Sequence, residues 1–387
     1  MSKPALLKVR FSSLDIFRGG TVALMILVNT PGSWEHIYAP LDHAKWHGCT
    51  PTDLVFPFFL FAVGNAMAFV LPRLKEGGDR MFWSKTLRRS ALIFGIGLLL
   101  NWFPFVRYNA DGNLAAKTFE NLRILGVLQR IALCYFFASV ILYYAGSRKA
   151  LYIGFIILLA YWGICVWANP ADPFSLQGWF GTAIDKSILG ENHMYHGEGL
   201  AFDPEGFMST PPAIVQVMLG YMVGEYILTK GKTPTMLNQL FVAGCLLVLT
   251  GYCWDMVFPI NKKIWTSSYV VYTTGLAILI LGVLIQRIEF DGKERRWTQF
   301  FTVFGKNPLF IFVFSGVWAR LYGLFRIHDG ELNGKPVFKG LGGWMYDHAF
   351  APLFGAMNGS LAYALAHILF FWLICRWLDK RKIYIKV

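Results

Sequence analysis

The chain has 387 residues, of which 55% are hydrophobic and only 15% are charged, and its formal net charge is +13. An ordinary soluble domain has about 25% charged residues, so this composition indicates a membrane protein. Several apolar runs approach the roughly 20 residues that a helix needs to cross a bilayer, and no strand-length alternation separates them, which argues against an outer-membrane barrel.

Ten apolar segments predict an all-α, polytopic bundle of about ten spanning helices. In chain order they lie near residues 14–31, 53–72, 87–104, 124–145, 150–168, 210–229, 236–256, 267–287, 299–322 and 359–378. No linker is long enough for a separate soluble domain, so residues 1–387 are expected to form a single integral-membrane domain. Of the connections, 323–358 is long enough to hold a short re-entrant or interfacial helix.

Lys and Arg residues are concentrated in every second connection between the expected helices. They are Lys3, Lys8 and Arg10 before the first helix, Arg73, Lys75, Arg80, Lys85, Arg88 and Arg89 after the second, Arg148 and Lys149 after the fourth, Lys230 and Lys232 after the sixth, Arg287, Lys293, Arg295 and Arg296 after the eighth, and Lys380, Arg381 and Lys382 after the tenth. By the positive-inside rule, both termini are expected to be cytoplasmic. Charges in such connections set orientation and meet anionic lipid, so no nucleic-acid partner is expected.

The N-terminal segment is basic but has no small-residue cleavage site after the next apolar run, which predicts a retained first helix. It carries no obvious organelle address, which favours a bacterial cytoplasmic (inner) membrane. Five of the six cysteines lie in or at the end of apolar spans, so no disulfide framework is expected.

Three histidines, His36, His43 and His47, lie in the first outer connection. His43 stands just before the second span in the string Asp42-His43-Ala44-Lys45-Trp46-His47-Gly48. A neutral imidazole there can take a proton from an attacking amine or hydroxyl, or attack an acyl group itself. The alternatives are a loop histidine without a function and a metal ligand shared with His36 and His47.

Polar residues interrupt the ends of the first two spans, where an unpaired polar group is costly and normally faces a cavity or a partner. Arg18 is expected at the cytoplasmic end of the first helix, and Asn29 and Asp53 at the outer ends of the first and second. Such residues can line a path across the membrane. For Asp53, a helix-capping or first-turn role is an equally good interpretation.

Gln129 and Arg130 fall one or two turns inside the fourth helix, between apolar neighbours. The guanidinium is expected to face inward, where it is either a partner for Asp53 or another internal acid, or a contact for an anionic ligand. Before the sixth span, Asp203-Pro204-Glu205-Gly206 indicates either a site for a hydroxylated or cationic acceptor or a turn that leads into a helix.

Two further strings lie at the ends of spans. Asn261, Lys262 and Trp265 precede the eighth span, where they indicate either an aromatic-belt anchor or a site for an anionic or sugar ligand. Lys306 and Asn307, in Gly305-Lys306-Asn307-Pro308, lie at a helix start on the cytoplasmic side, where backbone N–H groups can hold phosphate.

These strings together resemble the heparan-alpha-glucosaminide N-acetyltransferase family, part of a wider superfamily of transmembrane acyltransferases. The matching strings span nearly the whole chain: Ser13-Leu14-Asp15-Ile16-Phe17-Arg18-Gly19, Val28-Asn29, His43-Ala44 with Trp46 and Gly48, Asp53-Leu54-Val55-Phe56-Pro57, Gly126-Val127-Leu128-Gln129-Arg130, Asp203-Pro204-Glu205-Gly206, Asn261-Lys262 with Trp265-Thr266, and Gly305-Lys306-Asn307.

The resemblance implies that acetyl-CoA donates an acetyl group from the cytosol to a sugar on the far side of the membrane, at an amino-sugar nitrogen or a glycan hydroxyl. His43 matches the active histidine of the family, as general base or acyl carrier, and Asn29 matches its nearby asparagine. The other singled-out residues are expected to bind acetyl-CoA or the acceptor, no metal is expected, and a homodimer is possible. The alternative is a secondary transporter of a small polar or sugar-like solute, which predicts helices broken at corresponding places in two halves.

Overall fold

The computed structural model describes residues 11–109, 112–292, 296–332 and 335–385, and its regular elements are mostly helices. The helices are α1 (Ser12–Asn29), α2 (Val55–Glu76), α3 (Gly78–Trp102), α4 (Val127–Ala168), α5 (Gly181–Leu189), α6 (Thr210–Lys230), α7 (Pro234–Asp255), α8 (Ser267–Ile285), α9 (Arg296–Lys306), α10 (Pro308–Leu324), α11 (Leu341–Met345), α12 (Ala351–Phe354) and α13 (Ala356–Lys380). The expectation of an all-α membrane bundle is confirmed.

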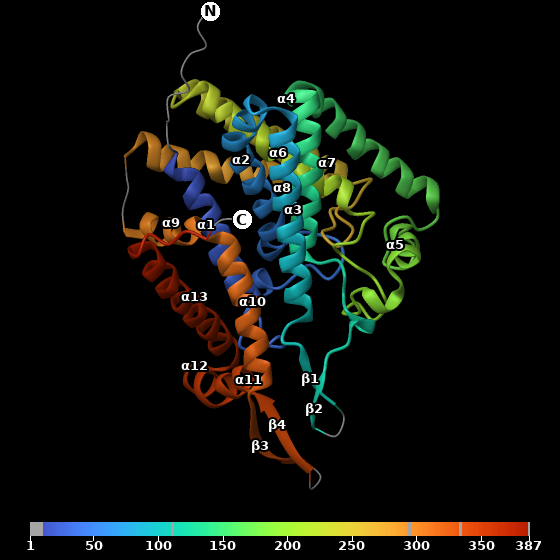
Figure 1. Ribbon diagram of the computed structural model, residues 1–387, viewed down its shortest axis with the longest axis vertical. Helices are drawn as coiled ribbons and strands as arrows, with labels where there is room; N and C mark the ends of the chain where they lie inside the picture. The colour runs from blue at the N-terminus through green and yellow to red at the C-terminus, as the bar shows by residue number, and fades with distance from the viewer. Residues whose placement is uncertain (1–10, 110–111, 293–295, 333–334, 386–387) are drawn as a thin grey trace, which may run out of the picture.

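Two short antiparallel hairpins stand at the lower end of the molecule in Figure 1. One pairs β1 (Val106–Tyr108) with β2 (Leu114–Ala116), and the other pairs β3 (Arg326–Leu332) with β4 (Lys335–Gly340). The connection 323–358 therefore holds a hairpin together with the short helices α11 and α12, where the sequence predicted a helix alone.

Each of the ten expected segments coincides with helical structure, but three are divided differently from the expectation. The segments near 124–145 and 150–168 form one element, α4, which breaks at Gly146, where φ is 70° and ψ is 168°. A glycine adopts this left-handed conformation at no steric cost. The segment near 299–322 is two helices, α9 and α10, which meet at Asn307 with a bend of 80°.

Six helices within the described ranges are long and apolar enough to cross a membrane, or seven if α9 and α10 count as one span. In that number α4 counts once, although it breaks at Gly146 and its 42 residues have a summed helical path of about 60 Å, roughly twice the thickness of a hydrocarbon core. The expected number of ten spans stays a prediction, as does the cytoplasmic location of both termini.

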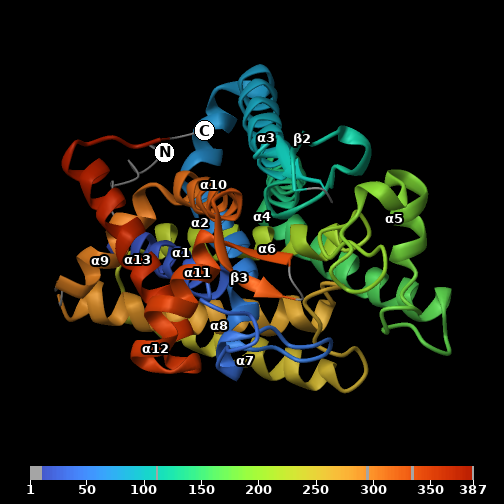
Figure 2. The same cartoon turned by 90° about the horizontal axis from the view of Figure 1, so that it is seen from below.

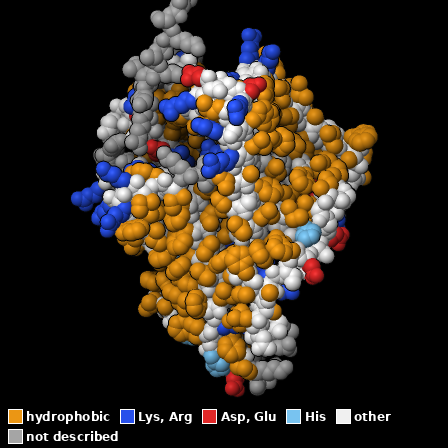
Figure 3. All heavy atoms as spheres, viewed as in Figure 1, with side chains coloured by type: hydrophobic (Ala, Val, Ile, Leu, Met, Phe, Trp, Pro, Cys, Tyr) orange, Lys and Arg blue, Asp and Glu red, His pale blue; other side chains and the backbone are white. Residues whose placement is uncertain are grey.

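Charged and apolar side chains occupy different areas of the surface. In Figure 3, Lys and Arg side chains gather near the top and upper left, and a wide apolar area lies below them. Exposed apolar residues on α4, α7 and α13 include Phe155, Ile156, Leu246 and Leu373. A wide apolar surface of this kind fits a protein surrounded by lipid. Of the basic residues that predict the sidedness, Lys3, Lys8, Arg10, Lys293 and Arg295 lie outside the described residues.

The helices pack in pairs, with α2 against α6, α7 against α8, and α4 against both α3 and α6. The pair of α1 and α9 approaches most closely at two glycines. A Cβ atom on Gly19 would lie 1.8 Å from the carbonyl oxygen of Phe301, and one on Gly305 would lie 2.2 Å from that of Asp15. Only glycine permits this backbone approach, which holds α9 across the first turns of α1.

The long connection 169–209 folds back over the bundle. It contains α5, and Figures 1 and 2 both show it at the side of the molecule opposite α9 and α13. Its last part, including Asp203 and Glu205, lies beside Arg123, just before α4. This connection therefore brings acidic residues to the region where the loop of His43 also lies.

Candidate active site

The loop between α1 and α2 is closed by Asp53, which lies in a 3-10 turn at Pro51–Leu54. One carboxylate oxygen, Oδ2, accepts hydrogen bonds from the backbone N–H of Ala44 at 3.0 Å and of Thr50 at 3.1 Å. It also accepts one from the Thr50 hydroxyl at 3.1 Å. The bond from the Thr50 N–H belongs to a capping box at the start of this turn. The capping interpretation of Asp53 is therefore confirmed for this oxygen.

The other oxygen of Asp53, Oδ1, lies 2.7 Å from Nδ1 of His43. The Asp53 side chain is only 2% exposed, whereas that of His43 is 42% exposed. When Nδ1–H donates to this carboxylate, the lone pair of Nε2 is free to accept a proton or to attack a carbonyl carbon. A buried carboxylate thus orients an accessible imidazole, which is the arrangement of a general base or nucleophile.

Lys262 is the third member of this cluster. Its Nζ lies 3.1 Å from Nδ1 and 3.5 Å from Nε2 of His43, and 3.5 Å from Oδ1 of Asp53. Burial lowers the pKa of Lys262, and the carboxylates of Asp53 and Glu205 act in the opposite direction. An ammonium group here balances the charge of the buried carboxylate.

His43 opens onto a cavity of about 240 Å³ whose other lining residues include Trp46, Arg123, Tyr195, Glu198, Glu205, Lys262, Lys263 and Trp265. Arg123 pairs with two acids: its Nη2 lies 2.6 Å from Oδ1 of Asp203 and 2.5 Å from Oε2 of Glu205. Burial raises the pKa of Asp203, while Arg123 and other nearby cations lower the pKa of Glu205 more than burial raises it. Lys263 likewise pairs with Glu198 at 2.6 Å.

Arg130 and Trp265 form the buried wall behind this cavity. Arg130 is fully buried and donates from Nη2 to the Gly206 carbonyl at 2.9 Å and to the Ser209 hydroxyl. Its guanidinium lies 5.3 Å from the ring centroid of Trp265, which is only 1% exposed. Arg130 therefore holds the turn of Asp203 and Glu205 and does not pair with Asp53, and Trp265 lines a cavity where an aromatic-belt anchor would face the lipid interface.

Asn261 shapes the turn that carries Lys262. It is fully buried, its Oδ1 accepts the N–H of Ile264 at 3.1 Å, and its own N–H donates to the Thr266 hydroxyl at 3.0 Å. Its side-chain oxygen is thus engaged within the loop, and a contribution of Asn261 to substrate binding stays a prediction.

Asn29 and Gln129 line a second cavity, of about 270 Å³, which shares Arg123 and Val127 with the cavity of His43. Gln129 is 1% exposed, and its Nε2 has no hydrogen-bond partner within the described part of the chain. A buried amide without a partner is costly, so this group is well placed to bind a ligand with a hydrogen-bond acceptor. The structure therefore places Asn29 in the cavity next to that of His43.

The remaining predicted residues lie at the opposite end of α1. Arg18 pairs with Asp15 at 2.6 Å and donates to the Gly305 carbonyl at 2.7 Å. Lys306 pairs with Asp379 at 2.7 Å. Asn307 is fully buried and ties down the end of the chain, because its Nδ2 donates to the Ile383 carbonyl and its Oδ1 accepts the N–H of Ile385. These three residues do not join the cluster of His43.

Among the residues that the structure describes, no group of three or more His, Cys, Asp or Glu side chains is placed to hold a metal ion. His36 lies against Ser33 and Tyr346, and His47 lies 3.4 Å from Asn261. The three histidines of the loop thus have separate partners.

Sequence reasoning missed Arg123, which links the two cavities. It lies in the third connection, on the predicted outer side, whereas most basic residues of the connections lie on the predicted inner side. This unusual position was a signal, because a cation that runs against the charge bias needs a partner or a function.

The model of the family described as "Heparan-alpha-glucosaminide N-acetyltransferase, catalytic" matches residues 10–251. Heparan-alpha-glucosaminide N-acetyltransferase of Homo sapiens is 28% identical over 371 residues, covering 81% of this chain and 54% of the human protein. The protein of Mus musculus with the same name is 26% identical over 362 residues, covering 79% of this chain and 53% of the mouse protein.

The matched region 10–251 contains His43, Asp53, Arg123, Asp203 and Glu205, whereas Lys262 lies beyond it. The chain spans about half the length of the two curated relatives. The match nevertheless covers more than half of this chain, and the chain belongs to the heparan-alpha-glucosaminide N-acetyltransferase family, a family of acyltransferases.

Proposed function

We propose that this protein is a multi-pass membrane acyltransferase that moves an acetyl group from cytosolic acetyl-CoA to a sugar acceptor on the far side of the membrane. The observation that carries the proposal is the pair of His43 and Asp53, 2.7 Å apart, which opens onto a cavity beside a second, polar cavity. The names of the relatives, which are acetyltransferases of a glucosaminide, support the same chemistry.

The two cavities suggest separate places for donor and acceptor. The cavity of Asn29 and Gln129 is lined by α10, whose other end lies on the predicted cytoplasmic side, so it suits the acyl-bearing arm of the donor. The cavity of His43, with the aromatic rings of Trp46 and Tyr195, suits a hydroxylated ring. CoA carries the activated acyl group, and the protein supplies position and proton transfer.

In the direct route, the acceptor nitrogen or oxygen attacks the thioester carbonyl while Nε2 of His43 removes its proton. The carbon–sulfur bond then breaks, and the imidazolium returns the proton to the leaving thiolate. Asp53 keeps Nδ1 protonated and stabilises the positive charge that forms on the ring.

In the two-step route, Nε2 of His43 attacks the carbonyl carbon itself and releases the CoA thiolate. The acetyl-imidazolium that forms then passes its acetyl group to the acceptor, the proton that the acceptor loses neutralises the CoA thiolate, and the ring returns to its neutral state. In both routes Asn29 acts as a donor to the developing oxyanion, a contribution of typically a few kcal/mol, while orientation of the ring falls to Asp53.

The cavity of His43, where we propose that the acceptor binds, contains glutamate side chains, and these are paired with cationic side chains. Glu205 is held by Arg123, and Glu198 by Lys263. A site with compensated charge and aromatic walls favours a sugar ring over a strongly charged solute, because stacking and hydroxyl contacts then dominate recognition. An amino-sugar nitrogen and a glycan hydroxyl both meet this description. A homodimer and a bacterial cytoplasmic membrane stay predictions.

The alternative of a secondary transporter draws support from the 80° break between α9 and α10, since broken helices line transporter sites. It gives no function to the carboxylate that orients His43. Flux of a solute across proteoliposomes without CoA release would favour the transporter.

The test is CoA release from acetyl-CoA by the purified protein in detergent, with and without glucosamine. We expect His43→Ala to lose release, and His36→Ala, a histidine of the same loop outside the cavity, to retain it. An acetylated His43 trapped without acceptor selects the two-step route. Full activity of His43→Ala would overturn the assignment.

A further inference from the structure

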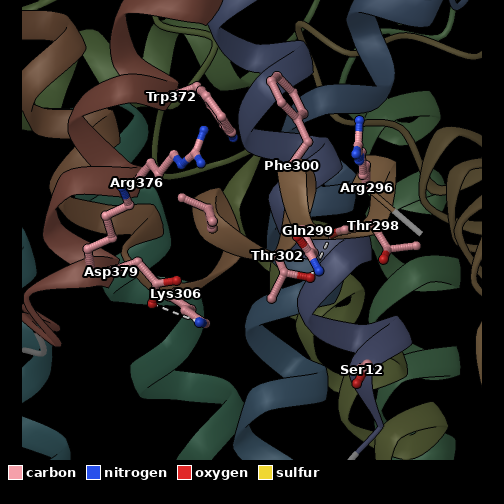
Figure 4. Close-up of a pocket in the computed structure, with 12 residues that line it drawn as sticks. Ser12, Arg296, Thr298, Gln299, Phe300, Thr302, Lys306, Trp372, Arg376 and Asp379 are labelled. Carbon is pink, nitrogen blue, oxygen red and sulfur yellow. Dashed lines mark hydrogen bonds and ion pairs between the residues drawn. The ribbon is translucent and has the colours of Figure 1, made fainter. Parts of the chain in front are cut away.

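A cavity of about 720 Å³ lies between α9 and α13, close to the start of α1, and far along the chain from the residues around His43. Figure 4 shows its lining, with Arg296 and Phe300 from α9 and Trp372 and Arg376 from α13. The two arginines reach it from opposite sides of Phe300 in this view.

The charges of this cavity are not balanced. Four cationic side chains line it, namely those of Arg296, Lys306, Arg376 and Lys380, together with one carboxylate, that of Asp379. That carboxylate is already engaged, because Oδ1 accepts from Lys306 Nζ at 2.7 Å and from the Tyr384 hydroxyl at 2.9 Å.

The two guanidinium groups of this cavity are exposed and accessible to a ligand. Within the described residues, neither Arg296 nor Arg376 has a hydrogen-bond or ion-pair partner, and the contact recorded for Arg376 is with the ring of Trp372, 5.0 Å from its centroid. Trp372 in turn stacks on Phe300, with ring centroids 5.3 Å apart and planes at 19°. Two guanidinium groups without a hydrogen-bond or ion-pair partner in the described chain thus lie in a cavity that the stacked rings of Trp372 and Phe300 also line.

We infer that this cavity binds a ligand that carries phosphate groups. A guanidinium presents parallel N–H donors that match phosphate oxygens, and several cations facing one space favour a ligand with more than one negative charge. Two ligands at this side of the membrane carry such phosphate groups: CoA, at its nucleotide end, and an anionic phospholipid, in its headgroup. The CoA source rests on the proposed function, and the phospholipid source does not.

The position of the cavity fits the first source. The cavity lies along α9, and α10, which follows directly after the bend at Asn307, lines the cavity of Asn29 with Ser315. Ser315 lies only about 10 Å along the axis of α10 from its first residue. A long ligand with its phosphates against α9 would therefore have its other end directed toward α10.

The experiment measures binding of CoA and of dephospho-CoA to the purified protein in detergent by calorimetry, and retention of phosphatidylglycerol and phosphatidylcholine in lipid nanodiscs. The variant is Arg296→Gln with Arg376→Gln, two exposed positions where folding is not at risk. The matched control is Arg80→Gln with Arg88→Gln, which removes the same charge from exposed positions on α3, outside the cavity.

If CoA is the ligand, the Arg296→Gln, Arg376→Gln variant binds CoA at least about tenfold more weakly, and the control binds it as the parent does. If the phospholipid is the ligand, the variant loses retained phosphatidylglycerol while CoA binding is unchanged. Unchanged binding of both ligands, or an equal loss in the control, overturns the inference.

Failure of the proposed function is distinguishable in the same samples. A protein that releases no CoA from acetyl-CoA but still binds CoA through Arg296 and Arg376 retains the phosphate site and loses the acyltransferase proposal. A protein that turns over acetyl-CoA normally in the double variant, with unchanged binding of both ligands, retains the proposed function and loses the phosphate site.

Discussion

Asp53 uses its two carboxylate oxygens for different partners. Oδ2 accepts the donors that close the loop, from Ala44 and Thr50, while Oδ1 faces Nδ1 of His43 at 2.7 Å. The capping interpretation of this residue is therefore confirmed for Oδ2, and a function of Oδ1 in orienting His43 for catalysis stays a prediction. A residue that serves the loop and the imidazole together couples the shape of the loop to the orientation of the ring.

Asp53→Asn is expected to lower kcat by at least about 100-fold with little change in KM, because an amide cannot hold Nδ1–H as a carboxylate does. Steady-state kinetics of CoA release check this. The control is Thr50→Ala, which removes one donor to Oδ2 and leaves Oδ1 beside His43. It should cost about 1 kcal/mol of stability and retain most of the activity. An equal loss of activity in both variants would mean that collapse of the loop, and not the ring, is responsible.

At the scale of the elements, one close helix contact holds α9 against α1. Gly19 and Gly305 let α1 and α9 meet backbone to backbone. The same contact positions α9 beside the cavity of Arg296 and Arg376 and sets the start of α10. A change at this contact is therefore expected to act on the whole α9–α10 unit.

Gly19→Ala should destabilise the protein by about 1–3 kcal/mol, because its Cβ would lie 1.8 Å from the Phe301 carbonyl oxygen and the helices must separate. The matched control is Gly95→Ala on α3, where a Cβ meets nothing within 4 Å. It should leave the unfolding temperature unchanged or slightly higher. Thermal unfolding in detergent compares the two, and equal stability of both variants would contradict the packing argument.

α5 is tied to the turn before α6 by a buried acid. Asp185 is fully buried, and its Oδ1 accepts the N–H of Phe207 at 2.9 Å and of Met208 at 3.4 Å. Within the described residues its Oδ2 has no hydrogen-bond partner. Burial raises the pKa of this carboxyl from 3.8 to about 6, so folding strengthens proton binding at Asp185.

The folded state therefore binds this proton more tightly than the unfolded state, and the stability contributed by Asp185 is lost as the pH rises from about 4 through about 6. Asp185→Asn, which is neutral at every pH, should be more stable than the parent at pH 7, by up to about 3 kcal/mol, and this advantage should shrink at pH 5. Unfolding temperatures at both pH values test this. An advantage that is the same at both would contradict the burial argument.

At the scale of the whole molecule, the distribution of basic residues predicts that the loops around α5 and His43 face away from the cytoplasm. The prediction can be tested with single cysteines in a background in which Cys49, Cys245 and Cys253 are replaced by serine. A membrane-impermeant maleimide added to intact cells should modify Ser187→Cys on α5 and not Lys85→Cys on α3. Both positions are exposed in the fold, so the reverse labelling pattern would overturn the orientation.

The sequence located the helices well where hydropathy changes abruptly and less well where backbone geometry decides. The run from 124 to 168 has two apolar segments around a polar centre, and no hydropathy signal tells a loop from a break within one helix at Gly146. The bend at Asn307 coincides with the string Gly305-Lys306-Asn307-Pro308, which the sequence indicated as a helix start, although the expected segment 299–322 ran through it.

By itself the sequence determined the membrane class, the helix positions and the polar residues at span ends. These features depend on local composition and on the thickness of the bilayer. Only the tertiary structure decided which polar groups meet. It paired His43 with Asp53, joined Arg123 to acids 80 and 82 residues away, and placed Asn29 in the neighbouring cavity. Loops that cross between helices make these contacts, and their paths follow from packing between distant segments, which no local pattern records.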